Sequence, residues 1–198
     1  LYAVFIIFLD KTANSRTAEA IIAMLIVIHL LSIIMQRNWF HKMMVLFTSG
    51  AFLLCVGIPF IGSYLYIHKP ELFLQHDGTM LSRIQLTTTF YLRNGGFGFY
   101  GFPIEDQDCL DMMFSYIGLH WGTAAFIIIS AAIIYAIYKA SREQHTSFLI
   151  LLFFFLVYGW AEVAPIYPVY SYLSLLLGYY IMNRKPFYCK RPYTCANF

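Results

Sequence analysis

A few charged side chains beside apolar stretches are the residues best placed to do chemistry in this sequence. Arg16, in "TANSRTAEA", precedes an apolar run, where an arginine either anchors a helix at the membrane edge or binds an anionic substrate. Glu162 ends another run, in "YGWAEVAP", and ionisable residues at membrane depth usually face a cavity and are functional candidates. At a helix end near the interface, the same carboxylate is otherwise simply solvated. Asp111 starts a third run, where it is either a second candidate or an acid favoured by the helix dipole.

A fourth candidate, Arg83, lies in the long polar stretch 69–111. Its surroundings, "SRIQLTTTFYL", have apolar and aromatic residues at helical spacing from Ile84, and Ser82 or Thr79 is a suitable cap. We therefore expect a short amphipathic helix along the membrane surface, with Arg83 in its first turn. A cation there opposes the helix dipole, which suggests that Arg83 has a partner.

Three further patterns are more simply explained as structural. The glycine-rich "NGGFGFYGFP" lacks the GK[ST] of a phosphate loop and is expected to be a flexible turn. His29 and His120 fall inside apolar runs and raise haem ligation as an alternative, but their expected depths do not match for one haem. A bond from each histidine to a neighbouring helix is the simpler interpretation. The four cysteines show neither CxxC pairs nor CxxC…H spacing, so we expect no metal, no disulfide framework and no cofactor.

The composition indicates the kind of protein that must position these residues. Of the 198 residues 60% are hydrophobic and only 12% are charged, whereas soluble domains contain about a quarter charged residues. We therefore predict an all-α integral membrane protein. The opening "LYAVFIIFL" is about half of the roughly 20 residues that span a bilayer, so we interpret it as the outer half of a helix whose beginning is missing.

Five further membrane spans are predicted, the second of them bent or ended near Gly57 and Pro59. Region 1–183 is then the membrane region, with an extracytoplasmic loop at 69–111, and 184–198 is a basic cytoplasmic tail. The five spans are Ala18–Met35, His41–Ile67, Met112–Tyr138, Thr146–Ala161 and Pro168–Met182.

The distribution of basic residues predicts the orientation in the membrane. Lysine and arginine concentrate on the cytoplasmic side of bacterial membranes. If the basic tail is cytoplasmic and the spans alternate, most basic residues lie inside and most acidic residues lie outside. The long loop, Arg16 and Glu162 then face the outside.

Taken in order, these short motifs resemble a known family. The series is "NSRT" opening a span, "SRIQL", a glycine-rich turn, "CLDMMFSYIGLHWG" and "YGWAEVAPIYPVYSYLSLLLG". It resembles the C-terminal half of bacterial polysaccharide polymerases of the Wzy type, which are related to O-antigen ligases. Arg16, Arg83, Asp111 and Glu162 occupy the positions of that family's motifs. The sequence departs from the family pattern where Ser82 replaces a glycine and Met112 an asparagine.

The resemblance implies a function at the outer face of the bacterial cytoplasmic membrane. The family polymerises oligosaccharide repeat units carried on undecaprenyl diphosphate, so Arg16 and Arg83 would bind the diphosphate and Glu162 or Asp111 would act as the base. The side chains expected to contact sugars are Tyr91, Phe99 and Tyr100, besides Phe90 and Phe97. The implied partners are the lipid-linked oligosaccharide, membrane lipid, and flippase and chain-length regulator proteins, with no nucleic acid. Two alternatives remain open, namely transport or flipping of a lipid-linked sugar and a non-catalytic accessory membrane subunit.

Overall fold

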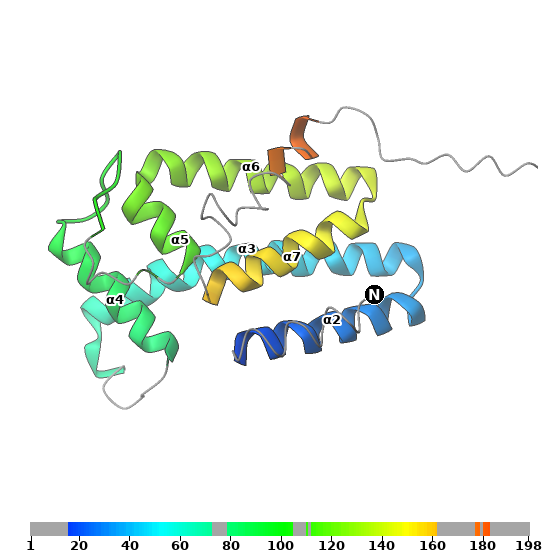
Figure 1. The fold of residues 1–198 in the computed structure, drawn as a ribbon, viewed down its shortest axis with the longest axis horizontal. Helices are drawn as coiled ribbons and strands as arrows, with labels where there is room; N and C mark the ends of the chain where they lie inside the picture. The colour runs from blue at the N-terminus through cyan, green and yellow to red at the C-terminus, as the bar shows by residue number, and fades with distance from the viewer. Residues whose placement is uncertain are drawn as a thin grey trace, which may run out of the picture.

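The part of the chain that the structure describes is built from helices. This computed structural model describes residues 16–72, 79–104, 110, 112–161, 177–178 and 180–182, with no strand among them. The elements are α2 (Arg16–Ile34), α3 (Arg37–His68), the 3-10 turn η1 (Pro70–Leu72), α4 (Thr79–Arg93), α5 (Met113–Tyr116), the π-helical turn η2 (Ile117–Trp121), α6 (Gly122–Glu143) and α7 (Thr146–Ala161) (Figure 1).

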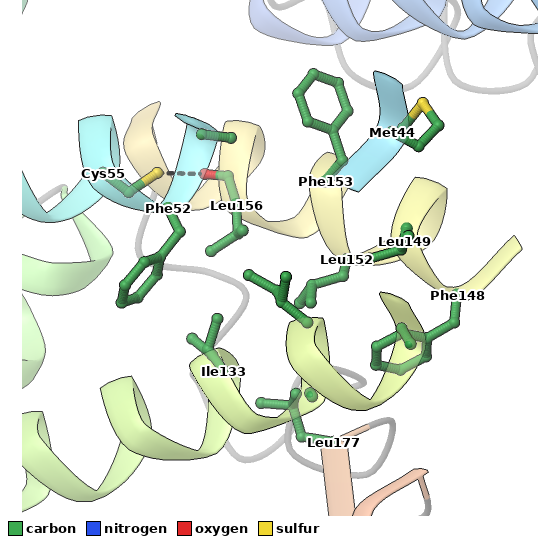
Figure 2. Packing of buried hydrophobic residues seen from close by; sticks show 14 of the residues in the cluster. Met44, Phe52, Cys55, Ile133, Phe148, Leu149, Leu152, Phe153, Leu156 and Leu177 are labelled. Atoms are coloured by element: carbon green, nitrogen blue, oxygen red, sulfur yellow. Dashed lines mark hydrogen bonds between the residues drawn. The ribbon is translucent and has the colours of Figure 1, made fainter. Parts of the chain in front are cut away.

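Helices α3 and α7 run side by side in the same direction and form the centre of the bundle (Figure 1). Thr48 of α3 donates a hydrogen bond to the carbonyl oxygen of Leu149 at 3.1 Å, and the Sγ of Cys55 donates one to the carbonyl oxygen of Leu156 at 2.8 Å. Small polar side chains of this kind join helices in membranes, where apolar contacts alone give little net driving force. Figure 2 shows the second of these bonds, with Ile133 of α6 facing the same cluster.

Two stretches, Arg37–His68 and Met113–Glu143, are long and apolar enough to cross a membrane. Only 28% of each apolar window is buried, whereas the core helix of a soluble protein would be mostly buried. Large apolar side chains such as Leu46, Leu53 and Ile128 are instead more than half exposed. Helices with apolar outer faces suggest association with a membrane.

The observed elements agree with the predicted ones in most places and differ in two. Helix α7 has the predicted bounds, and α2 begins and ends within two residues of its prediction. Helix α3 does not end at Gly57 or Pro59, because Pro59 lies inside a continuous helix. The span predicted from Met112 to Tyr138 is broken at Gly122. The first predicted half-span, and most of the last span and the tail, lie outside the described residues.

Candidate functional site

A concave feature of the described residues lies where α3 projects past the end of α7. Since Cys55 pairs with Leu156, Ala161 ends α7 about level with residue 60, and α3 continues for about 12 Å at 1.5 Å per residue. Helix α4 packs across this projecting part, with Ile84 against Gly62. A pocket of about 190 Å³ opens between α3, α4 and the glycine-rich turn, and it is lined by Phe60, Ser63, Tyr64, Ile67, His68, Thr87, Tyr91, Phe97 and Leu119.

The pocket combines aromatic walls with hydroxyl groups and the imidazole of His68. The Tyr91 and Phe97 rings meet edge to face with centroids 5.1 Å apart, and Tyr64 and His68 lie 4.4 Å apart. The hydroxyl of Thr87 donates to the Oγ of Ser115 at 3.2 Å, which ties α4 to α5. The Oγ of Ser63 is buried and has no hydrogen-bond partner among the described residues.

The wall formed by the glycine-rich turn is held in place by a break in the neighbouring helix. Gly122 has a φ of +92°, so the π-helical turn η2 and helix α6 do not form one continuous helix. At a break of this kind backbone groups lose their helical partners and need others. The N–H groups of Thr123 and Ala124 donate to the carbonyl oxygens of Gly98 and Phe99, and Phe102 N–H donates to the carbonyl oxygen of Leu119.

Two glycines make this close approach possible. Gly101 has a φ of +78°, and a Cβ there would overlap the carbonyl of His120. A Cβ on Gly122 would overlap the N of Gly101 and the O of Phe99. The glycine-rich segment is therefore a turn, as predicted, but its backbone is hydrogen-bonded to the broken helix rather than loose.

The two histidines that the sequence places inside apolar runs, His29 and His120, have separate surroundings and do not form a haem pair. His120 Nδ1 donates to the carbonyl oxygen of Phe102 at 2.8 Å, which makes it part of the same junction. His29 lies on the exposed face of α2. The bond of His120 goes to the glycine-rich turn and not to a neighbouring helix, so the predicted hydrogen-bonding role was correct while the partner was not.

The structure brings some of the predicted site residues to the pocket. Tyr91 lines it, and the half-buried Arg83 lies one turn before Thr87 on the same helix face. Because α4 begins at Thr79, Arg83 lies beyond the first turn, and the predicted conflict with the helix dipole does not arise. Phe99 and Tyr100 stack edge to face on the outer surface, 63% and 86% exposed, and do not line the pocket.

The other predicted residues are only partly located. Arg16 is the first residue of α2, and its side chain lies outside the description. Asp111 and Glu162 lie outside the described residues. Met113, which follows Asp111 in the chain, lies within contact distance of Gly159, which precedes Glu162. Helix α2, which starts at Arg16, begins at the end of the bundle where α7 ends (Figure 1).

Sequence reasoning missed the α3 side of the pocket. Ser63, Tyr64 and His68 belong to "GSYLYIH", which closes a long apolar run and was read only as the end of a span. The recurrence of polar and aromatic residues in its last two turns was the available signal. Thr87 was noted only as part of an amphipathic helix.

Comparisons with known proteins give no family for this arrangement. No protein-family model matches the chain, and no curated protein or solved structure matches it either. The architecture therefore defines the class only as a helical bundle with apolar outer faces and a polar, aromatic pocket at one end. Among the described residues no group of three or more His, Cys, Asp or Glu side chains could hold a metal ion.

Proposed function

We propose that this chain is part of a membrane glycosyltransferase that polymerises undecaprenyl-diphosphate-linked oligosaccharide repeat units at the outer face of a bacterial cytoplasmic membrane. The attacking hydroxyl of one repeat forms a bond to the anomeric carbon of the growing chain. The bond from that carbon to undecaprenyl diphosphate breaks, and the diphosphate leaves with the electron pair. Glu162 or Asp111 takes the hydroxyl proton, while Arg16 and Arg83 bind the diphosphate.

The observation that supports this proposal is that Arg83 lies one turn before Thr87, a residue that lines the pocket. Arg83 and Tyr91 stand on one short helix, whose Thr87 and Tyr91 line a pocket of aromatic rings and hydroxyl groups. A guanidinium suits a diphosphate because its paired donors match phosphate oxygens. Rings and hydroxyl groups suit a sugar, so the two parts of a lipid-linked sugar have complementary side chains at neighbouring positions. The apolar outer faces of the bundle suit the lipid.

The test is an assay of the purified protein with lipid-linked repeat units, in which product length is measured. Arg83→Ala should lower the rate about thirty- to a thousand-fold, since a charged contact in a partly dry site contributes about 2–4 kcal/mol in the transition state. Arg83→Lys should recover only part of the rate because lysine lacks the paired donors. Arg93→Ala is the matched control, because Arg93 ends the same helix on an exposed face and stacks on Phe90 at 5.2 Å. Equal losses from Arg83→Ala and Arg93→Ala, or none from either, would contradict the assignment.

Transport of a lipid-linked sugar is the second candidate, favoured by the helix break at Gly122. Many transporters bind substrate where helices are discontinuous near the middle of the membrane. Here, however, the backbone groups at the break are already bonded to the glycine-rich turn, because Gly98 and Phe99 accept from the N–H groups after the break and Phe102 donates to the carbonyl oxygen of Leu119. Vesicles that carry the protein and labelled lipid-linked sugar distinguish the two functions. A transporter moves the label across the bilayer without changing its length, whereas a polymerase lengthens it without moving it.

A further inference from the structure

The end of the bundle opposite the pocket brings two helix connections together. Figure 1 shows the α2–α3 and α6–α7 connections at one end and α4 at the other. Near the start of α3, Nδ1 of His41 accepts from the hydroxyl of Thr146 at 2.9 Å, and its Nε2–H donates to the carbonyl oxygen of Ser141 at 3.2 Å. These two bonds hold the beginning of α3 against the end of α6. The residues beside His41 and Ser141 therefore lie at one end of the molecule.

Two basic side chains at this end lie against exposed aromatic rings. The Nζ of Lys42 is 5.8 Å from the centre of the Trp39 ring, and the Cζ of Arg142 is 5.8 Å from the centre of the Tyr138 ring. Arg142 also donates to the hydroxyl of Tyr138 at 3.3 Å. Both rings are more than half exposed. Tryptophan and tyrosine beside lysine and arginine are typical of the level at which lipid headgroups meet the hydrocarbon of a membrane.

The charge that this end presents to its surroundings is positive. Lys42 and Arg142 are exposed, and Glu143 is the only acidic residue that the described part of the chain places here. The carboxylate of Glu143 accepts from the hydroxyl of Tyr180 at 3.3 Å and lies 3.7 Å from Nε2 of His145. Adjacent residues of a helix do not face each other, so Glu143 is not positioned to neutralise Arg142. The two basic groups therefore favour an anionic partner.

The helix surfaces next to the two pairs are apolar. Leu46 lies one turn beyond Lys42 on the same face of α3, and Ile134 lies one turn before Tyr138 on the same face of α6. Both of these side chains are more than half exposed. A free phosphate ion would contact only the charged groups. A phospholipid would place its headgroup at the charged groups and its acyl chains along the apolar faces.

We infer that this end of the bundle binds the headgroups of anionic phospholipids, at Lys42 beside Trp39 and at Arg142 beside Tyr138. The guanidinium of Arg142 offers paired donors to phosphate oxygens, and Lys42 supplies a compact charge. Clusters of basic residues at the membrane surface select anionic lipids over zwitterionic ones. The inference rests on association with a membrane and not on the proposed transfer reaction, since Arg83 lies on α4 at the opposite end.

Competition between two lipids tests this inference on the purified 198-residue chain. Native mass spectrometry in detergent, with equal amounts of dioleoyl phosphatidylglycerol and dioleoyl phosphatidylcholine, gives the ratio of the two lipids bound. The unchanged protein should bind at least fivefold more phosphatidylglycerol. The double variant Lys42→Gln with Arg142→Gln should lower this excess at least fivefold, since each basic residue at a charged lipid surface changes binding by about that factor.

The matched control is the double variant Lys69→Gln with Arg93→Gln at the other end of the bundle. It also removes one exposed lysine and one exposed arginine, and Arg93 likewise stacks on a ring, that of Phe90 at 5.2 Å. This control should change the lipid ratio less than twofold. Equal losses in the two double variants, or no excess of phosphatidylglycerol on the unchanged protein, would overturn the inference. Displacement of the bound lipid by inorganic phosphate would also overturn it, because the occupant would then be a free anion.

Fluorescence quenching in lipid vesicles gives a second measurement that needs no charge variant. The part of the tryptophan emission that Trp39→Phe removes reports on Trp39 itself. Brominated phosphatidylglycerol should quench this part more strongly than brominated phosphatidylcholine at the same mole fraction, because the anionic lipid is enriched beside Lys42. Equal quenching by the two brominated lipids would show that no anionic lipid gathers at this end.

Discussion

The two halves of α3 pack against different partners, and they differ in whether their buried hydroxyl groups are hydrogen-bonded. The first half packs against α7, with Met44 fully buried and the hydroxyl of Thr48 bonded to the carbonyl oxygens of Met44 and Leu149. The second half packs against α4 and the glycine-rich turn. There it leaves a pocket and the unpartnered hydroxyl of Ser63.

This difference separates the part of the molecule that holds it together from the part that is available for binding. In the first half, the buried side chains of His41 and Thr48 are hydrogen-bonded within the protein, and apolar side chains fill the space. In the second half a local rule is broken, because a buried polar atom lacks a partner. Proteins break such rules mainly at functional sites.

The largest effect should come from the junction that forms one wall of the pocket. Gly101→Ala or Gly122→Ala puts a Cβ into backbone atoms at a positive φ, so the neighbouring backbone must move. Backbone strain of about 1–3 kcal/mol and overpacking of about 1–3 kcal/mol together should destabilise the fold by about 2–6 kcal/mol. The measurement is the unfolding of purified protein in detergent, beside its yield.

Gly50→Ala is the control for these two variants. Gly50 lies inside α3, and an added Cβ meets nothing within 4 Å. Alanine favours a helix by about 0.5–1 kcal/mol over glycine, so this change should be neutral or slightly stabilising. If all three glycine variants unfold at the same point as the unchanged protein, the junction is not a fixed wall.

The next effect concerns the packed half of the molecule. Leu152 of α7 is fully buried in the central cluster, whereas its neighbour Leu151 is 44% exposed. Leu152→Ala should lower the free energy of unfolding by about 2–3 kcal/mol, the lower part of the range for such changes. Lipid solvates leucine as well as the core does, so the cavity left by the substitution accounts for most of the loss. Leu151→Ala should cost under about 1 kcal/mol. Equal losses in denaturant-induced unfolding would mean that α7 does not pack as described.

Parts of this architecture follow from the sequence because they depend on local patterns. Helix α7 could be delimited since an apolar run begins at Thr146 and ends at Ala161. The amphipathic helix α4 was predicted from spacing, with Ser82 or Thr79 as its cap, and its observed start at Thr79 places Arg83 beyond the first turn. The break at Gly122 was missed because a glycine in an apolar run is equally compatible with a continuous helix.

The pocket could not be predicted because its residues come together only in the folded chain. Ser63 lies on α3, Thr87 and Tyr91 lie on α4, and Phe97 lies in the glycine-rich turn. Nothing in their spacing relates the first to the others. What brings them together is the contact of Gly62 with Ile84, which depends on tertiary packing.

The smallest effects should give the sharpest contrast, because they compare two buried hydroxyl groups on the same helix. Thr48→Val keeps the shape and removes the hydroxyl bonded to Leu149. Hydrogen bonds between membrane helices contribute about 0.6 kcal/mol on average and about 1.7 kcal/mol at most, so this variant should be less stable by about 0.5–1.5 kcal/mol.

Ser63→Ala removes a hydroxyl that has no partner among the described residues. Without ligand it should therefore be neutral or up to about 1 kcal/mol more stable, since the cost of the unpaired group is relieved. Unfolding curves of both variants, each compared with the unchanged protein in the same detergent, give the two signs directly. If Ser63→Ala destabilises the protein as much as Thr48→Val, the Ser63 hydroxyl has a partner inside the protein. The buried hydroxyl groups of both halves of α3 are then hydrogen-bonded, and the contrast between the halves is wrong.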